Sequence, residues 1–311
     1  MQGHYSDVKP NELRTSVRSR SWIAKSSRSL IQGGQSVRNF ARSSPVGALG
    51  GAILALLVIV GIFAPFIAPY QPLGVNLEEK LLPPSTSHLF GTDHLGRDVF
   101  SRTIYGTRIS LLVGLVVVGI AGTSGVAIGL LGGYLGGIVD LILMRITDMF
   151  MAFPSLILAM AFAAALGPSL FNVMIAVSMT SWTGYARLVR SMALSIKMED
   201  YVTAAKAVGV SQQLIIIRHV LPNAITPVLV LATLQMGMTI LIASGLGFLG
   251  LGVQPPTPEW GAMISDGRAY MTTHLWVGAF PGLAILLACT GFNLFGDGLR
   301  DVLDPRLRGR I

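Results

Sequence analysis

One polar island organises this chain, and its residues 199–209 read EDYVTAAKAVG. Small or apolar side chains recur there at helical spacing, which predicts a short helix with one apolar face. The members of that face are Tyr201, Ala204, Ala205 and Val208. Asp200 is placed to cap the start of this helix, and Gly209 is the residue type that ends one. A face of small residues lets another backbone come close, which suits docking into a cleft of a partner. The simpler alternative is an unpartnered surface helix between two membrane spans.

The chain after the island predicts a second short helix. Ser211 is placed to cap it, and Leu214 and Ile217 continue it at helical spacing. Pro222 then opens a long apolar run, as proline does at the first turn of a helix.

The composition excludes an ordinary soluble domain. Of 311 residues, 52% are hydrophobic and 12% are charged, and the mean hydropathy is +0.64. A soluble domain carries about 25% charged residues, so the chain is predicted to be an all-α integral membrane protein. The net charge of +8 follows membrane topology and does not indicate a nucleic-acid partner. The lone Cys289 cannot form an internal disulfide, and no spacing of metal ligands occurs.

Six transmembrane helices are predicted from the runs that contain no Asp, Glu, Lys or Arg. These runs are 46–77, 109–139, 149–186, 219–258 and 269–296, and each exceeds the roughly 20 residues that cross a bilayer. The third run is broken at Gly167-Pro168-Ser169, a turn signal, and is interpreted as two spans. The glycine-rich end of the fourth run, 245–252, is interpreted as an irregular or re-entrant extension.

The distribution of Lys and Arg sets the orientation. With the N-terminus inside, 18 of these 23 residues fall in inside segments, so both termini are predicted to be cytoplasmic. The chain is therefore divided into four parts along its length. They are a basic cytoplasmic tail (1–45), a first transmembrane helix with an external loop (46–108), a five-helix core with a cytoplasmic loop at 187–222 (109–296), and a second cytoplasmic tail (297–311). The first tail has the composition of a transit peptide as well, but a tail that anchors the first helix is the simpler interpretation.

Two further patterns concern helix packing. Glycines recur every fourth residue at Gly125, Gly129, Gly133 and Gly137, which allows a close helix neighbour either within this chain or in another subunit. Asp140, Arg145 and Asp148 lie in the predicted connection 140–148. An Asp–Arg pair at neighbouring helical positions is sufficient to explain them.

The external loop carries the sequence LFGTDHLGRDVFSR at 89–102. Asp93, His94 and Asp98 could be imagined as metal ligands, but no second histidine stands at ligand spacing. Turn capping and Asp–Arg pairing explain these side chains more simply.

This loop, together with 248–261 (FLGLGVQPPTPEWG) and 292–305 (FNLFGDGLRDVLDP), resembles the signatures of the C-type permease subunit of peptide ABC importers. The island shares that family's cytoplasmic signature in Ala204-Ala205, Gly209 and Leu221-Pro222, although Thr203 stands where the family usually has Glu. The resemblance covers about residues 46–305 and implies the type I importer permease fold.

The resemblance also implies two sets of site residues. In that family the cytoplasmic loop forms coupling helices that sit in a groove of the ATPase subunit. The corresponding coupling residues here are Glu199, Asp200, Thr203, Ala204, Ala205, Gly209, Leu221 and Pro222. The external residues expected to face a binding protein are Asp93, Arg97, Asp98, Glu259 and Trp260.

The function implied by the resemblance is that of a permease subunit which moves small peptides or related solutes, such as dipeptides, oligopeptides or glutathione, across the cytoplasmic membrane. The expected partners are a second homologous permease in a heterodimer, two ATPase subunits, an external substrate-binding protein and membrane lipid. A nickel or opine importer is the alternative within the family. An ion-coupled secondary transporter is the alternative from another class, but the apolar runs lack the ionisable residues that such proteins usually need.

No catalytic function is expected of this chain. It lacks the Gly-x-x-x-x-Gly-Lys-Ser/Thr phosphate loop, and the dipeptide Gly-Lys does not occur in it. ATP and Mg²⁺ are therefore expected to bind to the partner ATPase subunits, and no cofactor is expected here. Motifs of an intramembrane protease or hydrolase are also missing from the sequence.

Overall fold

A computed structural model of the chain describes residues 40–303, which form helices and loops with one isolated bridge between Thr92 and Asp98. The chain divides into two compact units, Met1–Pro45 and Val46–Ile311. Residues 1–39 of the predicted basic tail and residues 304–311 of the second tail lie outside the described residues.

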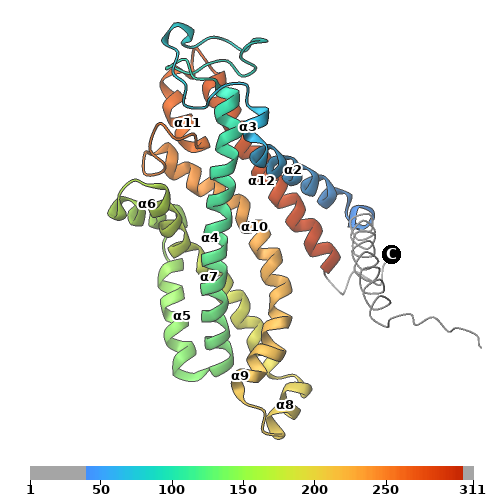
Figure 1. The fold of residues 1–311 in the computed structure, drawn as a ribbon. Coiled ribbons are helices and arrows are strands. Elements are labelled where there is room, and N and C mark those ends of the chain that lie inside the picture. The colour runs from blue at the N-terminus through green and yellow to red at the C-terminus, as the bar shows by residue number, and fades with distance from the viewer. Residues whose placement is uncertain (1–39, 304–311) are drawn as a thin grey trace, which may run out of the picture. The chain divides into compact units, whose positions relative to one another are not determined.

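The helices follow one another with short connections, except for the long loop before α4 (Figure 1). In chain order they are α2 Pro45–Ile62, α3 Ala64–Ile67, η1 Leu77–Glu79, α4 Val99–Leu135, α5 Gly137–Met151, α6 Ser155–Leu166, α7 Leu170–Lys197, α8 Asp200–Ala207, α9 Gln212–Ile215, η2 Ile216–Val220, α10 Leu221–Phe248, α11 Trp260–Gly267, η3 Arg268–Tyr270 and α12 Trp276–Leu303.

Four helices of the described part are long and apolar enough to cross a membrane: α2, α4, the continuous helix Gln212–Phe248 and α12. The pair α5 and α6 passes the same test together, bent by 90° at a short break, so the number is five if that pair is one span. The predicted all-helical membrane architecture is thus confirmed. The α7 helix has 28 residues but carries Arg187, Arg190 and Lys197 in its second half.

The α4 helix begins ten residues earlier than the predicted second span. Asp98 caps it, because its Oδ2 accepts a hydrogen bond from the backbone N–H of Ser101 at 2.7 Å. Residues 99–108, which were predicted as part of the external loop, therefore form the first turns of α4. Arg108 can lie on a long apolar helix because its guanidinium donates to the carbonyl oxygens of Gly61 and Ile62, where α2 ends.

The predicted break in the third apolar run is confirmed. Gly167 has a φ of +87° and ends α6, and the Ser169 hydroxyl accepts from the N–H of Asn172 to cap α7. The predicted connection at 140–148 is wrong, because these residues lie inside α5. The turn into α5 is instead made by Gly136 and Gly137, whose φ values are +70° and +58°.

The glycine stripe packs α4 directly on α7. A Cβ added to Gly125 would lie 2.5 Å from the carbonyl oxygen of Trp182, and one added to Gly133 would lie 2.7 Å from that of Arg190. Gly129 meets the carbonyl oxygen of Ala186 in the same way. Three of the four glycines therefore serve packing within this chain, which decides between the two alternatives; at Gly137 nothing lies within 4 Å.

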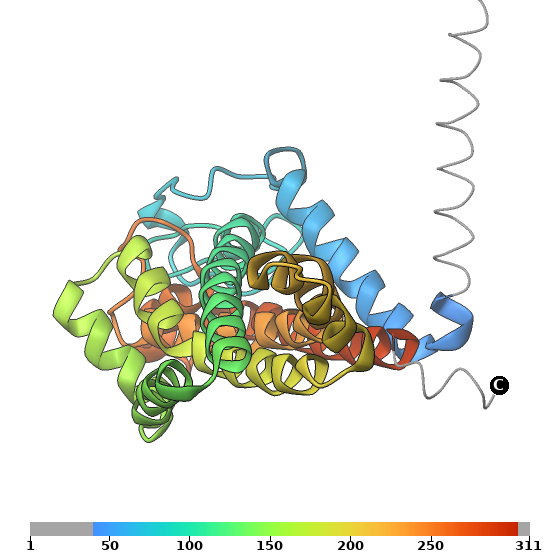
Figure 2. The same ribbon diagram turned by 90° about the horizontal axis from the view of Figure 1, so that it is seen from below.

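The second unit has two distinct ends. The loop that precedes α4 lies with α3 and α11 at one end, and α8 and α9 lie at the other, near the turn between α4 and α5 (Figure 1). Seen from below, α8 and α9 lie beside the end of α4, while α5 and α6 occupy its other side (Figure 2). The long α4 helix thus connects both ends. At the far end of α10, Gly245–Phe248 is still helical, and only 249–259 is irregular, so the predicted re-entrant extension is limited to a loop.

Candidate functional site

The polar island forms α8, as the sequence predicts, with its boundaries one residue from those expected. Glu199 occupies the N-cap position with extended backbone, and Asp200 is the first helical residue. Asp200 therefore supplies a negative charge to the first turn, which stabilises the positive end of the helix dipole. Gly209 ends the helix with a φ of +81°, a conformation that favours glycine.

One side of α8 is part of the protein core. Val202 is completely buried in a cluster that also contains Tyr134, Ile196 and Ile215. Ala205 is half-buried and packs against the same cluster. These contacts come from α4, α7 and α9, so α8 is held against the ends of helices that run through the whole unit.

The other side of α8 is exposed and largely apolar. Tyr201 is 45% exposed, Val208 is 80% exposed and Ala204 is exposed between them. Met198, just before the helix, is also 80% exposed. An apolar face of this kind on a polar loop is typical of a protein contact surface. The remaining predicted coupling residues are exposed or half-buried: Glu199, Asp200, Thr203, Gly209 and Pro222 are exposed, and Leu221 is half-buried.

Two lysines join the end of α7 and the α8 helix to the end of α4. Lys206 of α8 places its ammonium 5.7 Å from the centre of the Tyr134 ring. Lys197 lies 5.6 Å from the same ring and donates a 2.6 Å hydrogen bond to the Tyr134 carbonyl oxygen. A cation over an aromatic face is attracted by about 0.5–2 kcal/mol. No local pattern predicts this contact, because residues 134 and 206 are far apart in the sequence.

The segment after α8 differs from the expected separate short helix. Ser211 occupies the N-cap position, but α9 continues through a π-helical turn, Ile216–Val220, into α10 without a break. Pro222 follows the π-helical turn inside this continuous helix, where its missing N–H removes one backbone hydrogen bond. The loop is therefore one helix, α8, followed by the rigid start of the next long helix.

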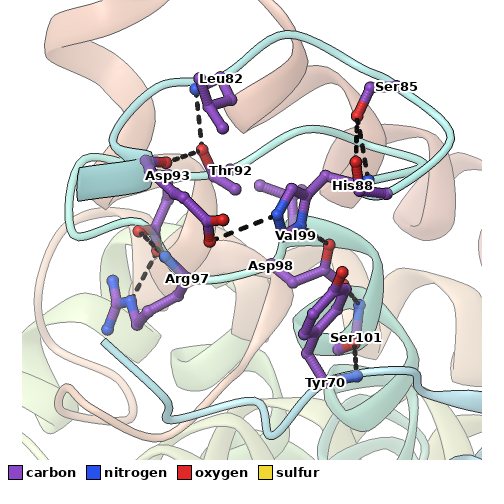
Figure 3. Close-up of polar contacts among 12 residues, drawn as sticks. Tyr70, Leu82, Ser85, His88, Thr92, Asp93, Arg97, Asp98, Val99 and Ser101 are labelled. Carbon is purple, nitrogen blue, oxygen red and sulfur yellow. Dashed lines mark hydrogen bonds and ion pairs between the residues drawn. The ribbon is translucent and has the colours of Figure 1, made fainter. Parts of the chain in front are cut away.

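At the opposite end, the external loop is held by a buried network of charges (Figure 3). Asp93 accepts from the backbone N–H groups of Leu95 and Arg97, and its Oδ2 lies 2.6 Å from Arg97 Nε. The predicted turn capping and Asp–Arg pairing are thus confirmed for Asp93. Arg97 also lies 3.5 Å from Asp266 of α11, which connects the loop to the second external segment.

His88 joins the network from a position that the sequence did not single out. Its Nδ1 lies 3.0 Å from Asp98 Oδ1 and its Nε2 lies 3.5 Å from Glu79, while its ring stacks on Tyr70 (Figure 3). The same Asp98 caps α4. The fold of the loop and the start of α4 are therefore specified by one set of contacts.

Glu259 and Trp260 lock α11 against α4 and α10. The Glu259 carboxylate accepts from the N–H groups of Gly261 and Ala262, both at 2.9 Å, and from the Ser244 hydroxyl at 3.3 Å. Burial raises the pKa of Glu259, and these hydrogen bonds oppose that shift. The Trp260 indole is completely buried and donates to the Thr103 carbonyl oxygen at 2.9 Å.

Burial corrects the prediction for the external residues. Each of the five side chains expected to face a binding protein is at most 5% exposed: Asp93, Arg97, Asp98, Glu259 and Trp260. Buried charges need partners of opposite sign or hydrogen bonds, and these residues supply them to one another and to helix ends. These five residues stabilise the external loop and the starts of α4 and α11, and they do not form an exposed contact surface.

The comparisons with known proteins identify the family. The sequence matches the family described as "Binding-protein-dependent transport system inner membrane component" over residues 125–309, and the "N-terminal TM domain of oligopeptide transport permease C" over residues 34–84.

The chain belongs to this permease family.

Curated relatives extend the match to most of the chain. It is 49% identical over 269 residues to a probable D,D-dipeptide transport system permease protein of Escherichia coli (strain K12), covering 86% of this chain and 90% of the relative. It is 44% identical over 267 residues to a dipeptide transport system permease protein of Alkalihalophilus pseudofirmus, covering 86% and 88%. It is 42% identical over 272 residues to a glutathione transport system permease protein of Pectobacterium atrosepticum, covering 87% and 90%. The resemblance to C-type permeases of peptide ABC importers is therefore confirmed, and the permease is a multi-pass protein of the inner membrane.

The Asp–Arg pairs of the permease connect two helices, where the sequence suggested pairs within one. The guanidinium of Arg190 in α7 donates two hydrogen bonds, of 2.5 and 2.6 Å, to the Asp140 carboxylate of α5. Arg187 donates a 2.6 Å hydrogen bond to Asp148. The two-pronged geometry matches the guanidinium fork to the carboxylate. These salt bridges join α5 to α7 at the end of the unit that also holds the α4–α5 turn and α8.

A hollow of about 630 Å³ lies between α7, α10 and α12. Its lining is mainly apolar, with Leu188, Pro227 and Leu234 among the residues that form it. Arg300 of α12 supplies its positive charge.

Proposed function

We propose that this permease forms half of the membrane pathway of an ATP-driven importer for small peptides, and that α8 is the element which docks on an ATPase subunit. The substrate class rests on the relatives, which are named for D,D-dipeptide, dipeptide and glutathione transport. The partners would be a homologous permease, two ATPase subunits that bind ATP and Mg²⁺, and an external binding protein.

The observation that carries the docking role is the division of α8 into two faces. Val202 is completely buried in the permease core, while Val208 and Tyr201 present apolar surface to the outside. A helix that is fixed on one side and exposes apolar side chains on the other can receive force from a partner and pass it to its own core. An unpartnered loop helix would gain nothing from exposing these side chains to water.

The proposed topology has six spans with both termini in the cytoplasm. The sixth span is α7, since 28 residues reach about 42 Å along a helix, enough to cross a bilayer core of about 30 Å. Its charged half is matched by the Asp140 and Asp148 carboxylates of α5, which removes the main objection to placing it against the membrane.

Cysteine labelling tests this topology. Single cysteines at the exposed positions Thr86, Thr257 and Ser211 are introduced after Cys289 is replaced by serine. Thr86→Cys and Thr257→Cys should react with an impermeant reagent added outside intact cells, and Ser211→Cys should react only after the membrane is opened. Labelling of Ser211→Cys from outside would contradict the topology and the docking role together.

The docking role is tested at Ala204, which is exposed in the permease, whereas a bulky residue at the half-buried Ala205 would also disturb the permease core. If Ala204 enters a fitted groove, Ala204→Trp should overfill it at a cost of about 1–3 kcal/mol, so ATPase co-purification and peptide uptake should both fall. Ala204→Ser should behave like the parent protein. Leu73→Trp, at an exposed position at the opposite end, is the positional control.

An Ala204→Trp permease that retains its ATPase subunits and full uptake would show that this face of α8 is not the contact. In reconstituted vesicles, uptake should require the ATPase subunits and ATP. Gradient-driven uptake by the permease alone would instead favour an ion-coupled transporter.

A further inference from the structure

A polar hollow lies between α5 and α7, next to the turn that joins α4 to α5. Its volume is about 310 Å³, and its lining combines charged and apolar side chains. The lining residues are Gly137, Asp140, Leu141, Met144, Arg145, Asp148 and Arg190. Nothing in the proposed transport function requires this hollow.

The charges around the hollow are unbalanced. Asp140 is taken by Arg190, and Asp148 is taken by Arg187. Arg145 has no hydrogen bond or ion pair with any of residues 40–303. Three arginines therefore face two aspartates, and the net charge of +1 resides on a side chain that is exposed and able to bind an anion.

The apolar surroundings of Arg145 indicate what kind of anion fits. Ile138, Leu141, Ile142 and Met149 lie at helical spacing on the same face of α5 as Arg145, and each is more than half exposed. In a protein of the inner membrane the membrane end of this stripe, at Met149, lies against acyl chains, while Ile138, Leu141 and Ile142 lie toward the headgroup region. An arginine inside the stripe is then placed to meet the headgroup that belongs to those chains.

The depth of Arg145 agrees with a headgroup position. From Arg108, which lies at the end of α2, to the end of α4 at Leu135, the helix rises about 40 Å. A hydrocarbon core of about 30 Å leaves about 10 Å of α4, and about the first seven residues of α5, beyond it. Arg145 comes just after these residues, so its long side chain can reach the phosphate level.

We propose that this hollow binds an anionic phospholipid, with the Arg145 guanidinium on the phosphodiester oxygens and the acyl chains against the membrane end of the exposed stripe of α5, at Met149. The guanidinium fork suits two phosphate oxygens, and basic hollows between transmembrane helices are known to take anionic headgroups. A single negative charge on the headgroup matches the net charge of the hollow. The bound lipid would cover the bridges between α5 and α7 from the membrane side.

Native mass spectrometry of the purified full-length permease, in an uncharged detergent, tests the proposal. The probe is phosphatidylglycerol, which carries one net negative charge. Loss of one charge-assisted contact should weaken its binding by about tenfold or more in Arg145→Gln. Arg145→Lys keeps the charge and should retain most of the binding. Arg218→Gln, at an exposed position outside the hollow, is the matched control and should bind as the parent protein does.

Two further probes distinguish an anionic phospholipid from a neutral one and from a soluble phosphate ester. Phosphatidylcholine has the same phosphodiester but no net charge and should bind more weakly than phosphatidylglycerol. Glycerol phosphate has no acyl chain and should not bind measurably. Equal binding of phosphatidylglycerol by Arg145→Gln and the parent protein would overturn the proposal. Tight binding of glycerol phosphate would overturn the lipid as the ligand. Thermal unfolding of each variant confirms that a loss of binding is not a loss of fold.

Discussion

Replacing Gly129 by alanine should destabilise the permease, because no room exists for one methyl group between α4 and α7. The added Cβ would lie 2.5 Å from the Ala186 carbonyl oxygen, 2.8 Å from Val189 Cβ and 3.0 Å from the Arg190 backbone nitrogen. Two of these atoms belong to the backbone of α7, so the contact cannot be relieved by a rotamer change. The helices must separate, which costs about 1–3 kcal/mol, while the better helix propensity of alanine returns up to about 1 kcal/mol.

Gly119 provides a matched control on the same helix. It also lies within α4, but an added Cβ has nothing within 4 Å. Gly119→Ala therefore gains the propensity without the overlap, and the difference between the two variants isolates the packing cost of about 1–3 kcal/mol. Reversible unfolding in mixed detergent micelles, followed by tryptophan fluorescence, measures that difference. Equal unfolding midpoints for Gly119→Ala and Gly129→Ala would refute the close packing of α4 on α7.

Three further predictions follow from the contacts at the two ends of the permease. Asp140→Asn leaves Arg190 without its charge partner in a part-buried site, and should lower the unfolding midpoint; restoring a neutral pair with Arg190→Gln should recover part of the loss, which a double-mutant cycle measures. Burial raises the pKa of Glu259 above its ordinary value of 4.5; the folded protein then holds this proton more tightly than the unfolded chain, so the contribution to stability is full below the ordinary pKa and is lost as pH rises through the raised one. The unfolding midpoint of the parent protein should therefore fall relative to that of Glu259→Gln as the pH rises above the ordinary carboxyl pKa of 4.5, and parallel pH profiles would contradict this assignment. Lys206→Met should lower transport per ATP hydrolysed in the assembled importer, because the attraction to the Tyr134 ring is lost; an unchanged ratio would remove that contact from the coupling.

Much of the architecture could be read from local patterns, because these patterns determine local structure directly. The break at Gly167, the end of α8 at Gly209 and the cap-and-pair turn at Asp93 all depend on residues within a few positions of one another. The start of α4 was misplaced for an instructive reason. A count of charged residues ends the span at Arg108, but its guanidinium is satisfied by the end of α2, which no local pattern reveals.

The contacts that define the sites are mostly long-range, and therefore they escaped prediction. Arg190 finds Asp140 across 50 positions, and Lys206 finds Tyr134 across 72 positions in the sequence. The motif around Asp93, Arg97 and Asp98 is visible in the sequence, but a single sequence does not show whether its charged side chains are exposed to a partner or buried in a network. Burial of Trp260 against Gly106 needs the tertiary structure to be seen.

The uninterrupted α4 helix has a mechanical consequence. It has 37 residues and no proline, so it spans about 55 Å as a single stiff strut. Asp98 caps its first turn and joins it to the external loop, and its last turn contacts Lys197 of α7 and Lys206 of α8. A tilt of only about 10° would swing one end by about 10 Å relative to the other at this length. The external loop at one end of α4 and the α8 helix at the other end would then move together, and neither could be displaced without the other.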